Sequence, residues 1–325
     1  MQLQVTGPVP GPRVLVMTGG TSGFGRRMIE RLLRERPDWS VILLARRSQH
    51  SESLEAWAGS AGLADRLRVV ACDLASLASV STGCDAVLAR LGRPIDALVL
   101  NAGIQAIRGD QASADGFELT FAVNHLAHVL IVDRLQPHVR KGGRIVVTSS
   151  EVHDPDAFCL VGITRAVWQA PEILADAVRA QDQYTTLLDR GEARYCASKL
   201  LNLMHVRHLA RQQSDIAVIA FNPSVVPGTG IARERNVLQI LGWRYILPLL
   251  APLLPGARSI DRSAGDLLWL ATEADATALH GQYVNGRAPE PGSADSRDIA
   301  KIDSVMTLSH RLLGEMPAPA VATSS

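Results

Sequence analysis

The stretch RVLVMTGGTSGFGRRMIERLLRER, residues 13–36, joins an apolar β-branched run, a glycine-rich turn and a run with helical spacing. Its turn carries Gly19, Gly23 and Gly25. Glycine lets the backbone turn tightly and leaves no Cβ in the way of a pyrophosphate. The following helix would offer free N–H groups and the positive end of its dipole. Such a turn can also bind nothing, but its place between a strand and a helix favours a dinucleotide site.

Further apolar runs alternate with helical patterns along the chain, at 40–45, 67–72, 96–101, 143–149 and 216–222. Continuous apolar strands indicate burial on both faces, as in a parallel sheet. The alternation predicts an α/β fold, a single Rossmann-type doubly wound parallel sheet with helices on both faces and ligands at the strands' carboxyl ends. No linker is visible, so one domain is expected over residues 1–325, with loose ends at 1–12 and 317–325.

Composition excludes several other classes of protein. A formal net charge of +1 gives no electrostatic case for binding nucleic acid. The four cysteines are scattered without a CxxC pair, so neither a zinc site nor a disulfide framework is predicted, and no metal is expected. The first residues lack a signal peptide, and the apolar stretch 237–254 contains Arg244 and two prolines, so no membrane-spanning helix is expected. We expect a cytoplasmic protein, with peripheral membrane contact through 237–254 left open.

The end of the second predicted strand, LLARRS (43–48), bears on cofactor choice. A carboxylate there would bind the ribose hydroxyls of NAD(H) and repel a 2′-phosphate. This chain has Arg46 and Arg47 instead, and a guanidinium pairs with phosphate by charge and by forked hydrogen bonds. Two solvated surface arginines are the alternative. NADP(H) is therefore predicted in preference to NAD(H), with Arg46 favoured over Arg47.

Polar residues follow the next two strands. Asp73, in ACDL, could accept a hydrogen bond from the adenine amino group, and Asn101, in NAG, would lie beside the adenine ribose. Either alone could be a turn residue. Both stand where successive parallel strands end, which favours the cofactor cleft.

The catalytic chemistry is predicted from YCASK, residues 195–199. Tyr195 and Lys199 are four residues apart and share one helix face. A nearby ammonium lowers the pKa of a phenol, which is normally roughly 10, so the phenol can give a proton to a reduced carbonyl or take one from an alcohol. Ser150, after the fifth strand, would hydrogen-bond the same oxygen, and Asn124 could anchor a water that passes protons to Lys199. A lone YxxxK is usually an ordinary surface pair; the upstream glycine turn and Ser150 argue against that here.

The motifs TGGTSGFG, CDL, NAG, VNH, TSS and YCASK, in this order, resemble those of the short-chain dehydrogenase/reductase family over roughly residues 13–230. The resemblance implies a Rossmann-type sheet, hydride transfer from a nicotinamide and a catalytic tetrad of Asn124, Ser150, Tyr195 and Lys199. Family members are often homo-oligomers, which the resemblance leaves open here. The cofactor-binding residues expected from the motifs and the resemblance are Gly19, Thr21, Ser22, Gly23, Phe24, Gly25, Arg46, Arg47, Asp73, Leu74, Asn101, Ala102, Gly103, Tyr195, Lys199, Pro223, Val226 and Thr229.

Finer details, VNHLAHVLI, SSEVH and YCASKLLNLM, are similar to the branch of retinol dehydrogenases and light-dependent protochlorophyllide reductases. The segment FNPSVVPGTG has Val225 and Ser224 where the protochlorophyllide reductases have cysteine and glycine. Those enzymes also usually lack the tetrad serine, which this chain keeps. Carbonyl/alcohol chemistry is therefore predicted. A carbon–carbon double-bond reductase and a non-catalytic NADP(H)-binding regulator are the alternatives.

Two segments are expected to cover the substrate. An insertion at 154–192 lies between Ser150 and Tyr195, so its ends are fixed beside the active site, and a second apolar segment spans 231–262. The apolar lid predicts an apolar substrate of medium to large size, either a carbonyl compound or an alcohol. The insertion could instead be a surface decoration, and the second segment could pack on a partner subunit or lie on a membrane surface. A structural role for His153 is as plausible as a substrate contact. The candidate substrate residues are His153, Phe158, Trp168 and Tyr184.

Overall fold

The computed structural model describes residue 9 and residues 11–106, 111–157, 168–177, 186–227 and 256–314. Three predicted site residues, Phe158, Tyr184 and Thr229, lie outside this part of the chain, as does the whole of 237–254. Among the helices that the structure describes, none is both long enough and apolar enough to cross a bilayer.

Eight strands form one sheet in the order β3-β2-β1-β4-β5-β6-β7-β8. The first seven strands pair in parallel and β8 pairs antiparallel with β7. Their bounds are β1 Arg13–Thr18, β2 Trp39–Ala45, β3 Leu67–Ala71, β4 Ile95–Leu100, β5 Val139–Thr148, β6 Ala217–Asn222, β7 Tyr283–Asn285 and β8 Ala288–Glu290. The order reverses beside β1, so a switch point lies between β1 and β4.

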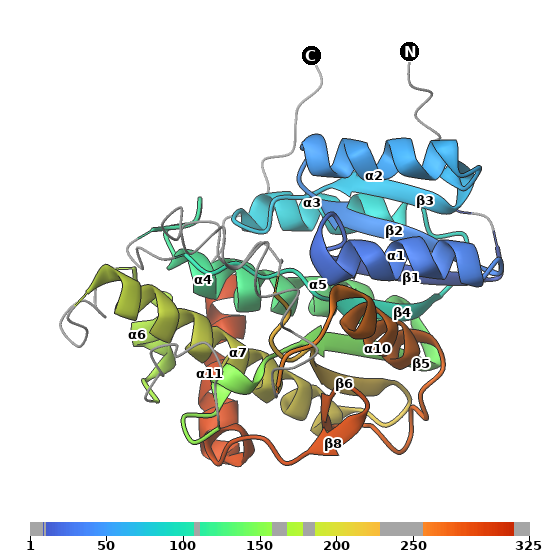
Figure 1. Ribbon diagram of the computed structural model, residues 1–325. Coiled ribbons are helices and arrows are strands. Elements are labelled where there is room, and N and C mark those ends of the chain that lie inside the picture. Colours follow the sequence, from blue (N-terminus) through green and yellow to red (C-terminus); the bar gives the residue numbers. More distant parts are fainter. Residues whose placement is uncertain are drawn as a thin grey trace, which may run out of the picture.

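Helices cover both faces of this sheet, with α1 and α10 side by side on one face (Figure 1). The α-helices in the described part of the chain are α1 Gly23–Glu35, α2 Gln49–Ser60, α3 Leu77–Leu88, α4 Leu119–Phe121, α5 Ala127–Leu135, α6 Pro171–Ala175, α7 Leu187–Gln212, α10 Ile260–Thr272 and α11 Ile299–Gly314. A π-helical turn, η2 (Ala122–Leu126), precedes α5, and short 3-10 turns include η4 (Glu151–His153) and η9 (Asp295–Arg297). The α/β doubly wound fold is therefore confirmed.

Successive side chains of β1 point to opposite faces of the sheet and pack into two different hydrophobic cores. Val14 and Val16 enter the core beneath α3, α5 and α7, whereas Leu15 and Met17 enter the core beneath α1, α2 and α10. All four side chains are fully buried. An apolar strand of this kind needs both faces covered, and the crossover helices of a parallel sheet supply that cover.

The structure refines the predicted boundaries of two segments. Residues 187–192, assigned to the insertion, form the first turns of α7. Residues 260–262, assigned to the second lid, begin α10, which packs on α1. The β7–β8 hairpin was not predicted from the sequence, because strands of three residues carry too little periodicity to recognise.

Candidate active site

The glycine turn after β1 is folded tightly against the end of β4. Gly19 has a φ of 70°, and a Cβ there would lie 2.5 Å from the Ala102 nitrogen. A Cβ at Gly25 would lie 2.2 Å from the Gly19 carbonyl oxygen. Gly23, with a φ of 57°, begins α1. Glycine is therefore required at Gly19 by both space and backbone conformation, and at Gly25 by space.

The beginning of α1 fits an anionic group. Ser22 is the N-cap residue, but its side chain makes no capping hydrogen bond, so it leaves the first N–H groups available. Ser22 is exposed and Thr21 is half-buried beside it. Phe24 packs edge-on against Phe221 at the end of β6, with ring centroids 6.3 Å apart, which fixes the direction of the first helical turn.

Asn101 bridges three strand ends with its amide group. Its Nδ2 donates to the Gly19 carbonyl at 2.8 Å, and its Oδ1 accepts from Thr148 Oγ1 at 3.0 Å. Thr18 Oγ1 accepts from the backbone nitrogens of Asn101 and Ala102, each at 3.1 Å. These hydrogen bonds of Asn101 hold the glycine turn against the ends of β4 and β5. Ala102 is half-buried and Gly103 is exposed on the same loop.

The two arginines after β2 differ in their surroundings. Arg47 Nη1 donates to Glu55 on α2 at 3.0 Å. Arg46 is exposed and has no ion pair or hydrogen bond with the residues that the structure describes. Arg46 is therefore the guanidinium still available to an outside anion.

Asp73 and Leu74, after β3, also serve the local turn. Asp73 Oδ1 accepts from the Ala75 nitrogen at 3.0 Å, while the Asp73 nitrogen donates to Ser79 Oγ at 2.9 Å. Leu74 packs against the core beneath α3. The turn alone accounts for one carboxylate oxygen of Asp73, and the contact with an adenine stays a prediction.

Tyr195 and Lys199 lie in the buried middle of α7. Lys199 Nζ lies 5.5 Å from the centroid of the Tyr195 ring and donates to the Thr148 carbonyl at 3.2 Å. Lys199 is 3% exposed and Tyr195 7% exposed. Burial lowers the pKa of the Lys199 ammonium to about 8. The pair has the geometry in which an ammonium can stabilise a phenolate.

Ser150 comes directly after β5 and before the turn η4. It is buried, and Val152 of the same turn packs against Tyr195. The neighbouring Ser149 Oγ donates to the Lys199 carbonyl at 2.8 Å, which ties the end of β5 to α7. The structure thus brings the segment that carries Ser150 to the part of α7 that carries Tyr195 and Lys199.

Asn124 lies fully buried in the π-helical turn η2. Its amide accepts from the Ile104 nitrogen at 2.8 Å and donates to the Ile104 carbonyl and to Ser198 Oγ, each at 2.9 Å. Asn124 Oδ1 and Lys199 Nζ both face Gly103: a Cβ there would lie 3.6 Å from the former and 3.2 Å from the latter. The structure therefore brings Asn124 beside Lys199.

The predicted residues after β6 follow the carboxyl end of the strand next to β5. The Pro223 carbonyl accepts from Ser263 Oγ at 3.0 Å, and Val226 is 5% exposed. Ser224 has a φ of 61°, so its backbone is in the left-handed region. This is the position at which the protochlorophyllide reductases have glycine. The Ser224 Oγ donates to Asn285 Oδ1 at 2.9 Å, which holds the serine in this conformation.

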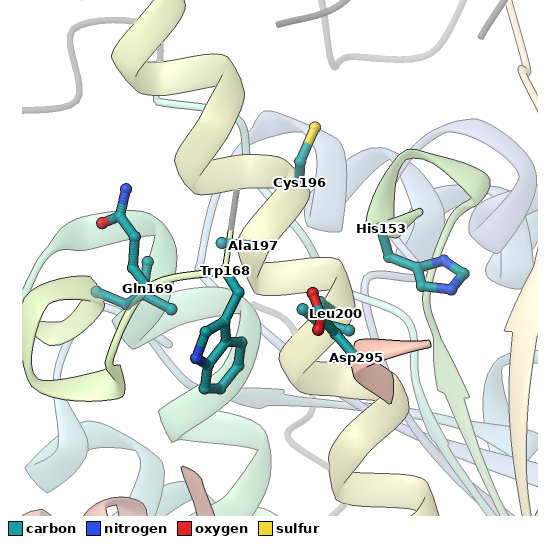
Figure 2. A pocket seen from close by; sticks show the side chains of 8 residues that line it. His153, Trp168, Gln169, Cys196, Ala197, Leu200 and Asp295 are labelled. Atoms are coloured by element: carbon teal, nitrogen blue, oxygen red, sulfur yellow. The ribbon is translucent and has the colours of Figure 1, made fainter. Parts of the chain in front are cut away.

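A small pocket beside α7 contains two of the candidate substrate residues. It is lined by His153, Trp168, Gln169, Leu174, Cys196, Ala197, Leu200 and Asp295. Trp168 forms one wall and has the Lys301 ammonium 5.1 Å from its ring centroid. Figure 2 shows that the His153 ring points away from Trp168. Both His153 ring nitrogens contact backbone atoms, those of Ser150 and Ser293, which favours the structural role for this residue.

Sequence reasoning missed several residues that hold this site together. His128 Nδ1 donates to the Asn124 carbonyl at 3.0 Å, and its Nε2 accepts from Thr18 Oγ1 at 3.1 Å. Thr148 joins Asn101 to Lys199 through its hydroxyl and its carbonyl. Spacing offered one clue, because His128 follows Asn124 by four residues and so shares its helix face.

Comparison with known proteins gives consistent matches. The family model described as short chain dehydrogenase matches residues 13–158. Retinol dehydrogenase 13 of Homo sapiens is 27% identical, over 96% of this chain and 87% of that protein. Protochlorophyllide reductase A of Oryza sativa subsp. japonica is 28% identical, over 68% of this chain and 59% of that protein.

Among solved structures, the NADPH-bound carbonyl reductase from chicken fatty liver superposes with a TM-score of 0.62. The alignment covers 87% of this chain and all of that one, at 18% sequence identity. At this identity the likeness shows the fold alone.

Proposed function

Because the chain belongs to the short-chain dehydrogenase/reductase family and is an oxidoreductase, we propose that it transfers a hydride between NADP(H) and the carbonyl or alcohol carbon of an apolar substrate of medium to large size. The observation that carries the proposal is the buried Tyr195–Lys199 pair on α7, next to the segment bearing Ser150, at the carboxyl ends of the parallel strands. Bound dihydronicotinamide would supply the hydride.

The chain's own residues would handle the proton and the developing charge. Tyr195 gives its phenolic proton to the substrate oxygen as the carbonyl carbon becomes an alcohol carbon, and the reverse reaction returns that proton. Lys199 stabilises the phenolate through its charge, and Ser150 donates a hydrogen bond to the same substrate oxygen. Asn124 faces the same glycine as Lys199, which supports a water link between them.

Four features support the cofactor and substrate assignments. The glycine turn and the uncapped start of α1 fit a pyrophosphate, and Arg46, which has no partner among the described residues, fits a 2′-phosphate. The pocket beside α7 has Trp168, Leu174 and Leu200 in its lining, together with the polar Gln169 and Asp295, and its apolar part suits an apolar group. The test is NADPH absorbance with a panel of benzaldehyde, cyclohexanone and retinal, run in the dark. We expect NADPH oxidation with at least one of these carbonyl compounds.

The alternatives predict different results in that test. NADPH binding without turnover of any carbonyl would contradict the proposal and favour the regulator. Turnover of an activated carbon–carbon double bond, without turnover of any carbonyl, would favour the double-bond reductase. The similarity to protochlorophyllide reductase A is the reason for considering this alternative.

Arg46→Ala should weaken NADPH binding while leaving NADH binding nearly unchanged. Loss of a charge-assisted phosphate contact costs about 1.5–3 kcal/mol, or roughly 10- to 100-fold in affinity. The measurement is the dissociation constant of each cofactor, by fluorescence or calorimetry. Arg47→Ala is the matched control, because Arg47 is paired with Glu55 and should contribute less. An equal loss for NADPH and NADH would show that Arg46 does not read the 2′-phosphate.

The pH profile of carbonyl reduction should fall on its alkaline side. Burial lowers the pKa of Lys199 from an ordinary value of 10.5 to about 8, so the ammonium loses its proton as pH rises through about 8. The neutral amine no longer stabilises the phenolate, so kcat/KM should decline in that window. The profile is measured together with the NADPH dissociation constant at each pH. A flat profile up to about pH 10 would contradict the assignment.

A further inference from the structure

His153 connects two segments that are far apart in sequence. Its Nδ1 lies 2.6 Å from the Ser150 carbonyl oxygen, and the backbone nitrogen of Ser293 lies 3.1 Å from its Nε2. A backbone N–H can only donate, so Nε2 must accept and the ring proton must be on Nδ1. That proton is then donated to the Ser150 carbonyl. The two contacts together determine the tautomer of the ring.

The ring is held firmly in this position. His153 is 4% exposed, and its ring packs edge-on against Tyr283 with centroids 4.9 Å apart. Gly292 has a φ of 67°, and a Cβ there would lie only 3.2 Å from His153 Nε2. Burial, with a smaller contribution from Arg207, lowers the pKa of His153 against the opposing effects of the Ser150 carbonyl, Asp154 and Glu290, which favours the neutral ring with Nε2 able to accept.

The loop that meets His153 is itself attached to the catalytic helix. Arg207, on α7, donates to Ser296 Oγ at 2.6 Å and to the Pro291 carbonyl. Ser293 lies between these two anchors, and its Oγ accepts from the Ser296 nitrogen at 3.3 Å. Hydrogen bonds therefore connect Ser150, through His153 and the loop 291–297, to α7, which carries Tyr195.

We propose that His153 is a positioning residue that clamps the Ser150 segment to the loop 291–297 and so sets the placement of Ser150 relative to Tyr195. The inference rests on the proposed function, in which Ser150 and Tyr195 act on one substrate oxygen. Both groups must reach that oxygen at hydrogen-bond distance, so a shift of the Ser150 backbone changes the reaction geometry directly. The loop 291–297 thereby helps to align the active site, although it contributes no catalytic group.

The test is a double-mutant cycle between His153→Phe and Ser150→Ala, using the carbonyl of the panel that is reduced fastest. Phenylalanine keeps the ring contact with Tyr283 and removes both hydrogen bonds. His153→Phe should lower kcat by roughly 10- to 100-fold with the NADPH dissociation constant unchanged, since the glycine turn is not involved. In the Ser150→Ala background the same change should lower kcat little further, because the group being positioned is already absent.

Conservative variants separate the two hydrogen bonds. Asparagine can place a donor near the position of Nδ1, whereas glutamine can place an acceptor near that of Nε2. His153→Asn should retain more kcat than His153→Gln if the bond to the Ser150 carbonyl is the one that positions the serine. These variants also keep the test open if His153→Phe fails to fold.

His280→Phe is the matched control. His280 Nδ1 accepts from the Val218 nitrogen at 3.4 Å and its Nε2 lies 3.0 Å from the Ala210 carbonyl oxygen, so it too bridges two backbone groups. Its partner Val218 lies near the beginning of β6, at the amino ends of the strands, whereas Ser150 follows the carboxyl end of the neighbouring strand β5. His280→Phe should reduce the melting temperature and leave kcat unchanged.

Two results would overturn the inference, and they can be told apart. If Ser150→Ala is impaired and His153→Phe lowers kcat by the same factor in both backgrounds, His153 acts on overall stability and the clamp is wrong while the proposed function stands. If Ser150→Ala keeps wild-type turnover, the serine has no part in the reaction, and both the clamp and the proposed role of Ser150 fail.

Discussion

Replacing Tyr195 with phenylalanine should reduce turnover by roughly 10²–10⁴-fold or more while NADPH still binds. The substitution removes the hydroxyl that carries the proton and keeps the ring that packs against Val152. Lys199 retains its hydrogen bond to the Thr148 carbonyl, so the local fold should persist. The measurement is single-turnover NADPH oxidation, with the cofactor dissociation constant determined separately.

Tyr283→Phe provides a control of the same chemistry. The Tyr283 side chain is buried, and phenylalanine removes its hydroxyl while keeping the ring against His153. This variant should turn over at the wild-type rate. Near-normal turnover by Tyr195→Phe would instead mean that another group protonates the substrate oxygen, and the proposed mechanism would be wrong.

The fold could be predicted from the sequence because its signals are local. The apolar run before the glycine turn, residues 13–18, matches β1 at both ends. The predicted ranges of the next five strands differ from the observed ones by no more than one residue at each boundary, except at the start of β5, where the difference is four. A parallel sheet buries both faces of each strand, so a short apolar run bounded by turn residues is informative by itself. The Tyr195–Lys199 spacing is equally local, since one helical turn separates them.

The contacts that complete the site depend on tertiary structure and left no such signal. Asn101 could be placed at a strand end, but its bridge between Gly19 and Thr148 requires the register of three strands. The contact of His153 with Ser293 spans 140 positions of sequence, so no spacing rule could reveal it. The glycine turn marks where a phosphate can approach, whereas the hydrogen bonds that shape the turn come from β4 and β5.

The bond between Asn101 and Gly19 also explains why Gly25 matters although its backbone is ordinary helix. Gly25 is the third residue of α1, and a Cβ there would lie 2.2 Å from the Gly19 carbonyl oxygen and 2.6 Å from Asn101 Nδ2. Both atoms belong to the hydrogen bond that holds the glycine turn to β4. An alanine at this position must break that bond or push α1 away from the turn.

We therefore expect Gly25→Ala to destabilise the fold by ~1–3 kcal/mol, as overpacking does, and to weaken NADPH binding by roughly 100-fold, or ~3 kcal/mol. NADH binding should fall equally, because the turn meets the part common to both cofactors, and this separates the effect from that of Arg46→Ala. Gly59→Ala, in α2, is the matched control: no atom lies within 4 Å of its added Cβ, so alanine should be neutral or stabilise the helix. The measurements are the melting temperature of each variant and its dissociation constants for NADPH and NADH. If Gly25→Ala matched Gly59→Ala in melting temperature and in both affinities, close approach at the glycine turn would not be what binds the cofactor.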